Sequence, residues 1–155
     1  MILGEKWIAH HGAHGQQSTL GIVAETSKNH PIFNGIIPGT IWGATDVYAI
    51  RLPMSDTVIP LLFGQVTERN GPYDKKDLFF GMRPSDSEPA GMVKRINKQG
   101  DTISIDLNAP MMPVAWIKSY RIPGGRTGKV FATTMGASPD FPIYYCWAMI
   151  GRLIR

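Results

Sequence analysis

Glycine and proline interrupt this chain along its whole length. Seventeen glycines and twelve prolines among 155 residues divide the sequence into short segments, because both residue types disfavour the interior of long helices and mark turns. Apolar residues make up 43% of the chain, which is enough to bury a core. The sequence therefore predicts one domain over residues 1–155, built of short elements joined by many turns, and it argues against a helical bundle.

The charge of the chain is low and scattered. Charged residues make up 18% of the sequence and the formal net charge is +4, which together with the apolar content indicates a folded chain. The densest basic groups are Lys94-Arg95 with Lys98, and Arg121 with Arg126 and Lys129; both are flanked by turn residues, as is typical of solvated loops. Since no basic stripe carries interleaved aromatic residues, we expect no nucleic-acid partner.

The compartment is indicated by the cysteine and by the hydrophobic runs. Cys146 is the only cysteine, so no intrachain disulfide can form, which is typical of a reducing compartment. We expect no signal peptide, because Gly4, Glu5 and Lys6 follow the opening apolar residues at once. No apolar run approaches the roughly 20 residues needed to cross a bilayer. We expect a cytoplasmic protein without a membrane partner.

Short segments of alternating or β-branched residues predict strands, and two segments predict helices. The expected strands are 6–10, 41–52, 58–66, 113–117 and 129–134, with a hairpin over 91–108 that buries one of its faces. The expected helices are 16–24, which follows a glycine-rich turn at 10–15, and 143–153, which is apolar almost all round.

All four histidines of the chain fall within its first thirty residues. His10, His11 and His14 lie on the glycine-rich turn and His30 lies beyond it. A strand that ends in such a turn before a helix offers free backbone N–H groups, which favour an oxygen-rich ligand. This pattern predicts a ligand site at His10, His11, Gly12 and His14; the alternative is that these imidazoles only bond neighbouring backbone.

A metal site is the sharper interpretation of the same cluster. His11 and His14 are three residues apart and can share a helical face, but zinc needs three or four ligands and no carboxylate lies nearby in the sequence. We therefore expect no metal and no cofactor, and keep a metal-dependent enzyme using His10, His11 and His14 as an alternative.

Nucleophilic catalysis by a thiol is not expected. A cysteine amidotransferase carries its thiol at a turn between a strand and a helix, beside a histidine, whereas Cys146 falls inside the apolar segment 143–153. Ser18 follows the turn at 10–15 too late to take that place. The catalytic residues, if the chain has any, stay unknown at this point.

An acidic residue alternates with aromatic residues in the segment 41–52. In a strand, Asp46 and Tyr48 lie on one face together with Trp42. A carboxylate beside aromatic rings suits a sugar, because sugar hydroxyls donate to acceptors and the faces of sugar rings pack on aromatic rings. The alternative is that Asp46 bonds a turn and Tyr48 is core, and Trp116 is also interpreted as core.

Several segments together resemble the ThuA-like family, named for trehalose utilisation. They occur in the family's order over nearly the whole chain, and the ordered set is more specific than any one segment. The segments are Trp7-Ile8-Ala9-His10-His11-Gly12-Ala13, His30-Pro31-Ile32 before Gly35, Thr45-Asp46-Val47-Tyr48, Pro113-Val114-Ala115-Trp116, Ser119-Tyr120, and Gly128 to Gly136.

The resemblance implies an α/β fold of the class I glutamine-amidotransferase-like (flavodoxin-like) type. In this chain it would be a reduced mixed sheet flanked by a few helices, with the N-terminal βα units missing. The resemblance also implies that His11 stands where amidotransferases carry the cysteine, and that the pocket is lined by the turn at 10–15, the strand with Asp46 and the loop with Gly136. Ala137 departs from the family, which often has histidine there.

These observations lead to one favoured function and two alternatives. The favoured function is a ThuA-like domain that binds or acts on a carbohydrate or similar polar small molecule, at His10, His11, Gly12, His14, Asp46, Tyr48 and Gly136. The alternatives are the metal-dependent enzyme and a non-catalytic, self-associating remnant of the family. A homodimer is expected, because the missing strands would leave a sheet edge and apolar helix faces uncovered.

Overall fold

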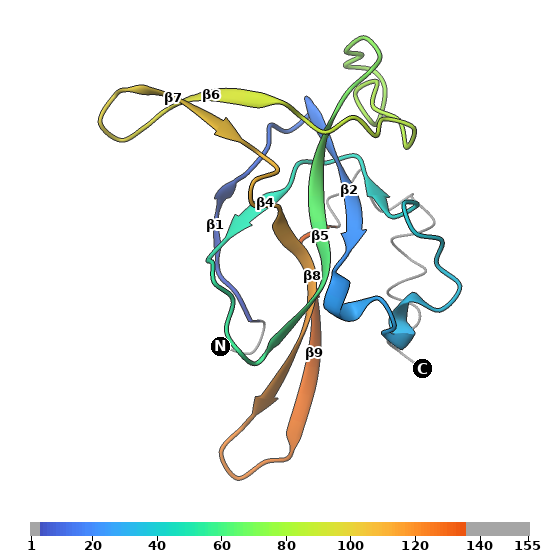
Figure 1. Ribbon diagram of the computed structural model, residues 1–155, viewed down its shortest axis with the longest axis vertical. Coiled ribbons are helices and arrows are strands. Elements are labelled where there is room, and N and C mark those ends of the chain that lie inside the picture. The colour runs from blue at the N-terminus through green and yellow to red at the C-terminus, as the bar shows by residue number, and fades with distance from the viewer. Residues whose placement is uncertain (1–3, 136–155) are drawn as a thin grey trace.

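Antiparallel β-strands form almost all of the regular structure. The computed structural model describes residues 4–135, and within this range the only helical elements are two short 3-10 turns, η1 (Glu25–Ser27) and η2 (Pro31–Phe33). The strands, labelled in Figure 1, are β1 (Trp7–His10), β2 (Gln17–Val23), β3 (Trp42–Gly43), β4 (Tyr48–Ile50), β5 (Val58–Glu68), β6 (Met92–Ile96), β7 (Thr102–Asp106), β8 (Met112–Arg121) and β9 (Thr127–Thr133).

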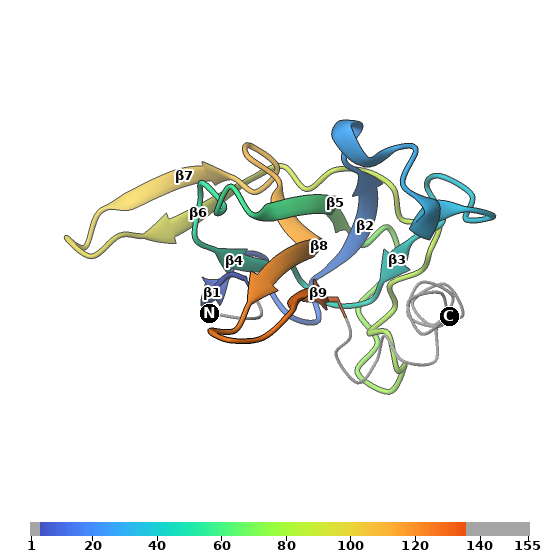
Figure 2. The ribbon, with the colours of Figure 1, turned by 90° about the horizontal axis from the view of Figure 1, so that it is seen from below.

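These strands form three antiparallel sheets. The largest has five strands in the order β3-β2-β5-β8-β9, and β1 pairs with β4 and β6 with β7 in two-stranded sheets. The centre of the large sheet is the pairing of β2 with β5, which runs without a bulge from Gln17↔Glu68 to Val23↔Leu62. In both views the β6–β7 hairpin projects away from the five-stranded sheet (Figure 1, Figure 2).

The predicted α/β fold, a reduced class I glutamine-amidotransferase-like mixed sheet flanked by helices, is therefore wrong for the described residues. Such a fold needs parallel strands joined by crossover helices. Here every paired strand is antiparallel to its neighbour, and no α-helix occurs in the range 4–135.

The segment 16–24 shows one physical reason for this correction. The sequence predicts a helix here, but 17–23 form β2, which lies between β3 and β5 in the large sheet. Its β-branched residues Thr19, Ile22 and Val23 favour a strand. Gly21 would weaken a helix interior, whereas in the strand its missing side chain leaves room for Ile41, whose Cγ2 would lie 2.8 Å from a Cβ at this position.

The predicted strand at 41–52 is divided into two. β3 pairs with β2 and β4 pairs with β1, so the chain bends through residues 44–47 to pass from one sheet to another. The expected strands at 6–10, 58–66, 113–117 and 129–134 and the hairpin at 91–108 are confirmed. The buried face expected of the hairpin is confirmed only in part, because Leu107 is buried and Ile105 half-buried whereas Ile103 is exposed.

The core lies against the five-stranded sheet. Its main cluster is contributed by β5, β8 and the segments that cross them, and it contains Ile32, Ile41, Val47, Leu61, Leu62, Val66, Ala90, Leu107, Val114, Ala115 and Met135. Trp116 is buried with Ile50 and Val58 in a smaller cluster, which confirms its interpretation as core. Val47 belongs to the main cluster, so the core fixes the backbone beside Asp46.

Two further sequence predictions concern residues outside the described range. The expected helix at 143–153 with Cys146, and Gly136 and Ala137, lie outside the range 4–135. Within that range no helix is long and apolar enough to cross a membrane.

Candidate functional site

The glycine-rich turn at 10–15 is held by hydrogen bonds from both sides. His11 N–H donates to the Val47 carbonyl at 2.8 Å, and Ala13 N–H donates to Oε1 of Gln17 at 2.9 Å. Gly15 closes the turn with a φ of +72°, which glycine adopts without strain. The turn therefore carries its histidines on a fixed backbone. The free backbone N–H groups that were expected to meet a ligand are not found at His11, Gly12 and Ala13, whose N–H groups all bond the protein.

Asp46 lies in the bend between β3 and β4 and is equally fixed. The hydroxyl of Thr19 donates to the Thr45 carbonyl at 2.6 Å on one side of Asp46. The Val47 carbonyl on the other side accepts from His11 N–H, and also from Gly12 N–H at 3.3 Å. The sequence placed Asp46 on a strand shared with Tyr48, and this is wrong because only 48–50 are paired with β1.

The carboxylate of Asp46 joins two histidines of the turn. His10 Nδ1 lies 2.8 Å from Asp46 Oδ2, and His14 Nδ1 lies 3.4 Å from Asp46 Oδ1. The Asp46 side chain is only 1% exposed, whereas those of His10 and His14 are 56% and 53% exposed. A buried carboxylate needs such partners. The result is a group of three side chains that presents its imidazoles to solvent.

The proton positions follow from what a carboxylate can accept. An ionised carboxylate only accepts hydrogen bonds, so His10 Nδ1 is the donor in its bond to Asp46 Oδ2, whereas His14 Nδ1 faces Asp46 Oδ1 at 3.4 Å as an ion-pair contact. Within residues 4–135 the Nε2 atoms of both rings make no hydrogen bond to the protein. A carboxylate that binds Nδ1–H fixes the tautomer and the orientation of an imidazole, and leaves Nε2 to meet a ligand.

Aromatic rings border the imidazole of His10. The ring of Tyr48 is 5.2 Å from that of His10, and the ring of Trp7 is 6.0 Å from it, both edge-on. Trp7 and Tyr48 also meet edge-on at 6.4 Å. Trp7 is 52% exposed, so its ring offers an apolar face to solvent beside the polar cluster. We name the five residues Trp7, His10, His14, Asp46 and Tyr48 the histidine–aspartate cluster.

The other predicted histidines take structural roles. His11 Nε2 lies 2.7 Å from the Leu107 carbonyl, which can only accept, so Nε2 is the donor. His30 Nδ1 accepts from Ile32 N–H at 3.2 Å and caps η2. Both bond backbone, which was the alternative interpretation of the histidines. Gly12 is buried beneath the cluster rather than open to a ligand, and Gly136 lies outside the described residues.

A second group of residues beside the cluster carried no signal in the sequence. The ring of Phe80 lies 5.6 Å from that of His14, and Tyr73 stacks on Phe80 at 6.0 Å. Arg69 lies over Tyr73 at 5.1 Å and donates from Nη1 to the Gly15 carbonyl at 2.9 Å. These residues belong to a loop without periodicity, so only the folded chain brings them to the turn.

A metal centre is not formed by the described residues. Within the range 4–135, no group of three or more His, Cys, Asp and Glu side chains is arranged to hold a metal ion. The Nδ1 atoms of His10 and His14 point to Asp46, and His11 points away to Leu107.

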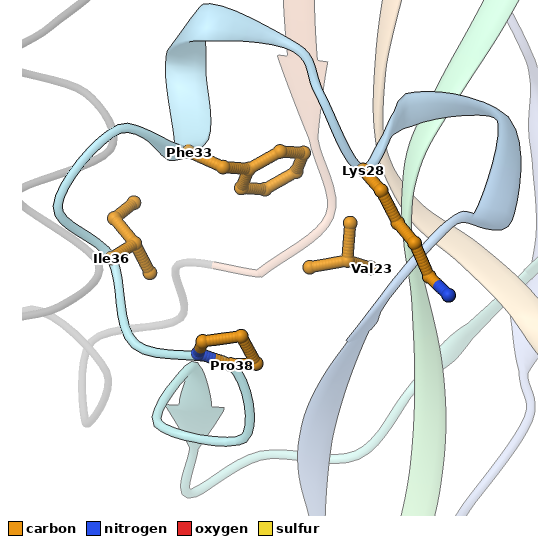
Figure 3. Close-up of a pocket in the computed structure, with 5 residues that line it drawn as sticks. All are labelled: Val23, Lys28, Phe33, Ile36 and Pro38. Carbon is orange, nitrogen blue, oxygen red and sulfur yellow. The ribbon is translucent and has the colours of Figure 1, made fainter.

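Two hollows lie near the sheet. One, of about 270 Å³, is lined by Val23, Lys28, Phe33, Ile36 and Pro38 (Figure 3). Its lining is apolar apart from Lys28, whose ammonium pairs with Glu25 at 2.6 Å. The other, of about 230 Å³, is polar and lies beside the turn, lined by Gln16, Gln17, Glu68 and Arg69. Polar groups that fix a ligand's orientation are a mark of binding sites, which favours the polar hollow over the apolar one.

Comparison of the chain with protein-family models, with curated proteins and with solved structures finds no match. The function must therefore be argued from the chemistry of the site itself.

Proposed function

We propose that this protein binds a polar, polyhydroxylated small molecule, a carbohydrate or a similar compound, at the histidine–aspartate cluster. The observation that carries the proposal is that one buried carboxylate, Asp46, holds the two half-exposed imidazoles of His10 and His14. Structural histidines usually turn their nitrogen atoms to backbone, as His11 and His30 do here.

The two outward Nε2 atoms suit hydroxyl groups. In the tautomer set by Asp46, each Nε2 is an acceptor for a hydroxyl proton, and a hydroxyl is both donor and acceptor. Trp7 and Tyr48 add an apolar surface on the same side, on which the C–H face of a sugar ring can pack. A site for a polar organic ligand usually combines a small number of oriented polar groups with an aromatic surface.

General acid–base catalysis is a second candidate for the same residues. It is favoured by the orientation of each imidazole through Nδ1, since a base held by a carboxylate is the arrangement that proton transfer requires. In this case His10 or His14 removes a proton from the bound ligand and Asp46 keeps the ring in place. The readout is conversion of a bound sugar, followed by NMR of the ligand, with loss in His10→Gln.

The metal-dependent alternative makes a different prediction. A metalloenzyme would hold about one transition metal per chain through its histidines. We expect elemental analysis of the purified protein to find less than stoichiometric zinc; a tightly held metal that is lost in His11→Ala would favour the alternative. A cytoplasmic location, the absence of nucleic-acid and membrane partners, and a homodimer complete the proposal.

Calorimetric titration tests binding directly. The ligands are glucose, trehalose, maltotetraose and sorbitol, and the variants are Asp46→Asn and, as a matched control, Asp56→Asn, which changes an exposed aspartate without a hydrogen bond at its side chain among the described residues. We expect at least one ligand to bind, Asp46→Asn to weaken it roughly tenfold or more, and Asp56→Asn to leave it unchanged. Equal weakening by both variants, or no binding by any ligand, would contradict the proposal.

A further inference from the structure

Aromatic and polar side chains continue from the histidine–aspartate cluster to the polar hollow at Gln16. From Trp7 the ring contacts pass to His10, and Asp46 joins His10 to His14. From His14 they pass to Phe80, whose ring stacks on Tyr73. The contacts of Asp46 with His10 and His14, and that of His14 with Phe80, join segments far apart in sequence.

The loop that carries Tyr73 is tied to the turn by Arg69. Its guanidinium donates from Nη1 to the Gly15 carbonyl at 2.9 Å and from Nε to the Gly71 carbonyl at 3.1 Å, and it lies over the Tyr73 ring. Arg69 also lines the polar hollow of about 230 Å³ with Gln16, Gln17 and Glu68. The hollow and the exposed Tyr73 ring therefore share a wall.

Phe80 lies between His14 and Tyr73 with a strained backbone conformation. Its φ of +56° is the only positive value of a non-glycine residue in the described chain, and a bulky side chain rarely adopts it. In this conformation the Phe80 ring lies over Gly15 and between His14 and Tyr73. Strain of this kind collects at ligand sites.

We infer that the ligand is an unbranched oligosaccharide rather than a single sugar ring. One part of it occupies the histidine–aspartate cluster, and its continuation packs on Tyr73 and enters the hollow lined by Gln16, Gln17, Glu68 and Arg69. Amide, carboxylate and guanidinium groups in this hollow suit the hydroxyls of a further ring. Tyr73, which is 48% exposed, offers the apolar face. The inference rests on the proposed function, which it extends by a second subsite.

The dependence of affinity on chain length is the test. Calorimetry measures the dissociation constants of glucose, maltose, maltotetraose and maltohexaose, and in parallel those of the cellodextrins. The variants are Tyr73→Leu, which removes the ring face but keeps apolar bulk, and Leu78→Ala, a control for another exposed side chain of the same loop. Two linked contacts raise the affinity through their effective concentration.

We expect the longer sugars of one series to bind roughly tenfold or more tighter than maltose or cellobiose. Tyr73→Leu removes this gain and leaves the short sugar unchanged, and Leu78→Ala changes neither. Equal affinities for all chain lengths, or an equal loss for short and long sugars in Tyr73→Leu, would overturn the second subsite while the proposed function stands. If no sugar of any length binds, the proposed function itself fails.

Discussion

Gly12 lies against Asp46 and Gln17 with no space for a side chain. A Cβ at this position would be 3.0 Å from Gln17 Oε1 and 3.1 Å from the Asp46 Cβ. The atoms that would have to move are the hydrogen-bonded amide that holds the turn and the base of the carboxylate that holds two imidazoles. The candidate site thus depends on a residue that touches no ligand.

We expect Gly12→Ala to lower the free energy of unfolding by about 1–3 kcal/mol, the usual cost of overpacking. Gly91→Ala is the matched control, because a Cβ at Gly91 meets no atom within 4 Å, and it should stay within about 0.5 kcal/mol of the unaltered chain. Urea unfolding measures both. Equal stabilities of the two variants would show that the packing around Gly12 does not constrain the turn.

Asp46→Asn tests the hydrogen bonds of the carboxylate separately from its volume. The amide keeps one oxygen that can accept and replaces the other with an NH₂ group that cannot, so either the hydrogen bond from His10 Nδ1 or the ion-pair contact with His14 Nδ1 is lost. We expect a loss of about 1–3 kcal/mol in the free energy of unfolding, the cost of a buried polar group without its partner. Asp56→Asn should cost nothing measurable by the same urea titration; a similar loss in both would be the contrary result.

The loop between β5 and β6 carries half of the inferred site, and one aspartate holds its turn. Asp77 accepts from Phe79 N–H at 2.8 Å and pairs with the Arg83 guanidinium. The backbone hydrogen bond from Phe79, followed by the bond from Arg83, holds the pKa of Asp77 below its usual value of 3.8. Its ionised form therefore favours the folded loop.

The sign of this pH effect follows from a lowered pKa in the folded state. The contribution is complete above about pH 5 and is lost progressively as the pH falls through the lower, folded pKa. We expect the amide of Phe79 to lose protection from hydrogen exchange below this range, relative to the sequence-dependent intrinsic rate. Asp77→Asn should show the low-pH behaviour already at pH 6. A protection that is unchanged by acid in the unaltered chain would contradict this role.

At the scale of elements, the sequence predicted the positions of the strands better than it predicted which strands pair with each other. β5, β8, β9 and the β6–β7 hairpin alternate or end at Gly and Pro, and these local signals suffice to find them. β2 was mistaken for a helix because a glycine turn followed by polar residues resembles a helix start. The fold class depends on pairings such as Gln17↔Glu68, which are far apart in sequence and leave no local signal.

The sequence predicted some residues of the candidate site and missed others. His10, His14, Asp46 and Tyr48 were all predicted, and the fold brings them into contact, although Asp46 reaches the histidines from a bend and not from a strand. His11 and Gly12 were expected to meet a ligand but serve the backbone and the packing beneath. Phe80 and Tyr73 could not be found, because a loop has no periodicity from which to infer its contacts.

At the scale of the whole molecule, the β6–β7 hairpin projects from the sheet (Figure 2), and several of its apolar side chains are exposed. Met92 is 63% exposed and Ile96 76%, and they lie on one face of β6, two residues on either side of Lys94. The other face of β6 is held to the molecule, because Val93 packs against the main core cluster and Arg95 donates to the His11 carbonyl. The uncovered surface is therefore the face of Met92 and Ile96. Pairing of two copies about a two-fold axis is the commonest way to cover such a surface.

We therefore keep the homodimer as a prediction, with this hairpin at its interface. Sedimentation equilibrium at micromolar concentration should find a species of twice the 17.1 kDa chain mass, and Ile96→Lys should shift it towards the monomer. A single 17.1 kDa species in the unaltered protein would exclude the dimer at that concentration.

The central claim is that Asp46 organises His10 and His14 into one ligand site. It is tested most directly by the ¹⁵N signals of the imidazole rings during titration with maltohexaose, with His30 as the internal reference because it caps η2. The account predicts Nδ1–H tautomers for His10 and His14 before addition, and Nε2 signals of both that move together along one binding curve while those of His30 stay in place. Nε2–H tautomers in the free protein, or signals that move separately or not at all, would contradict it.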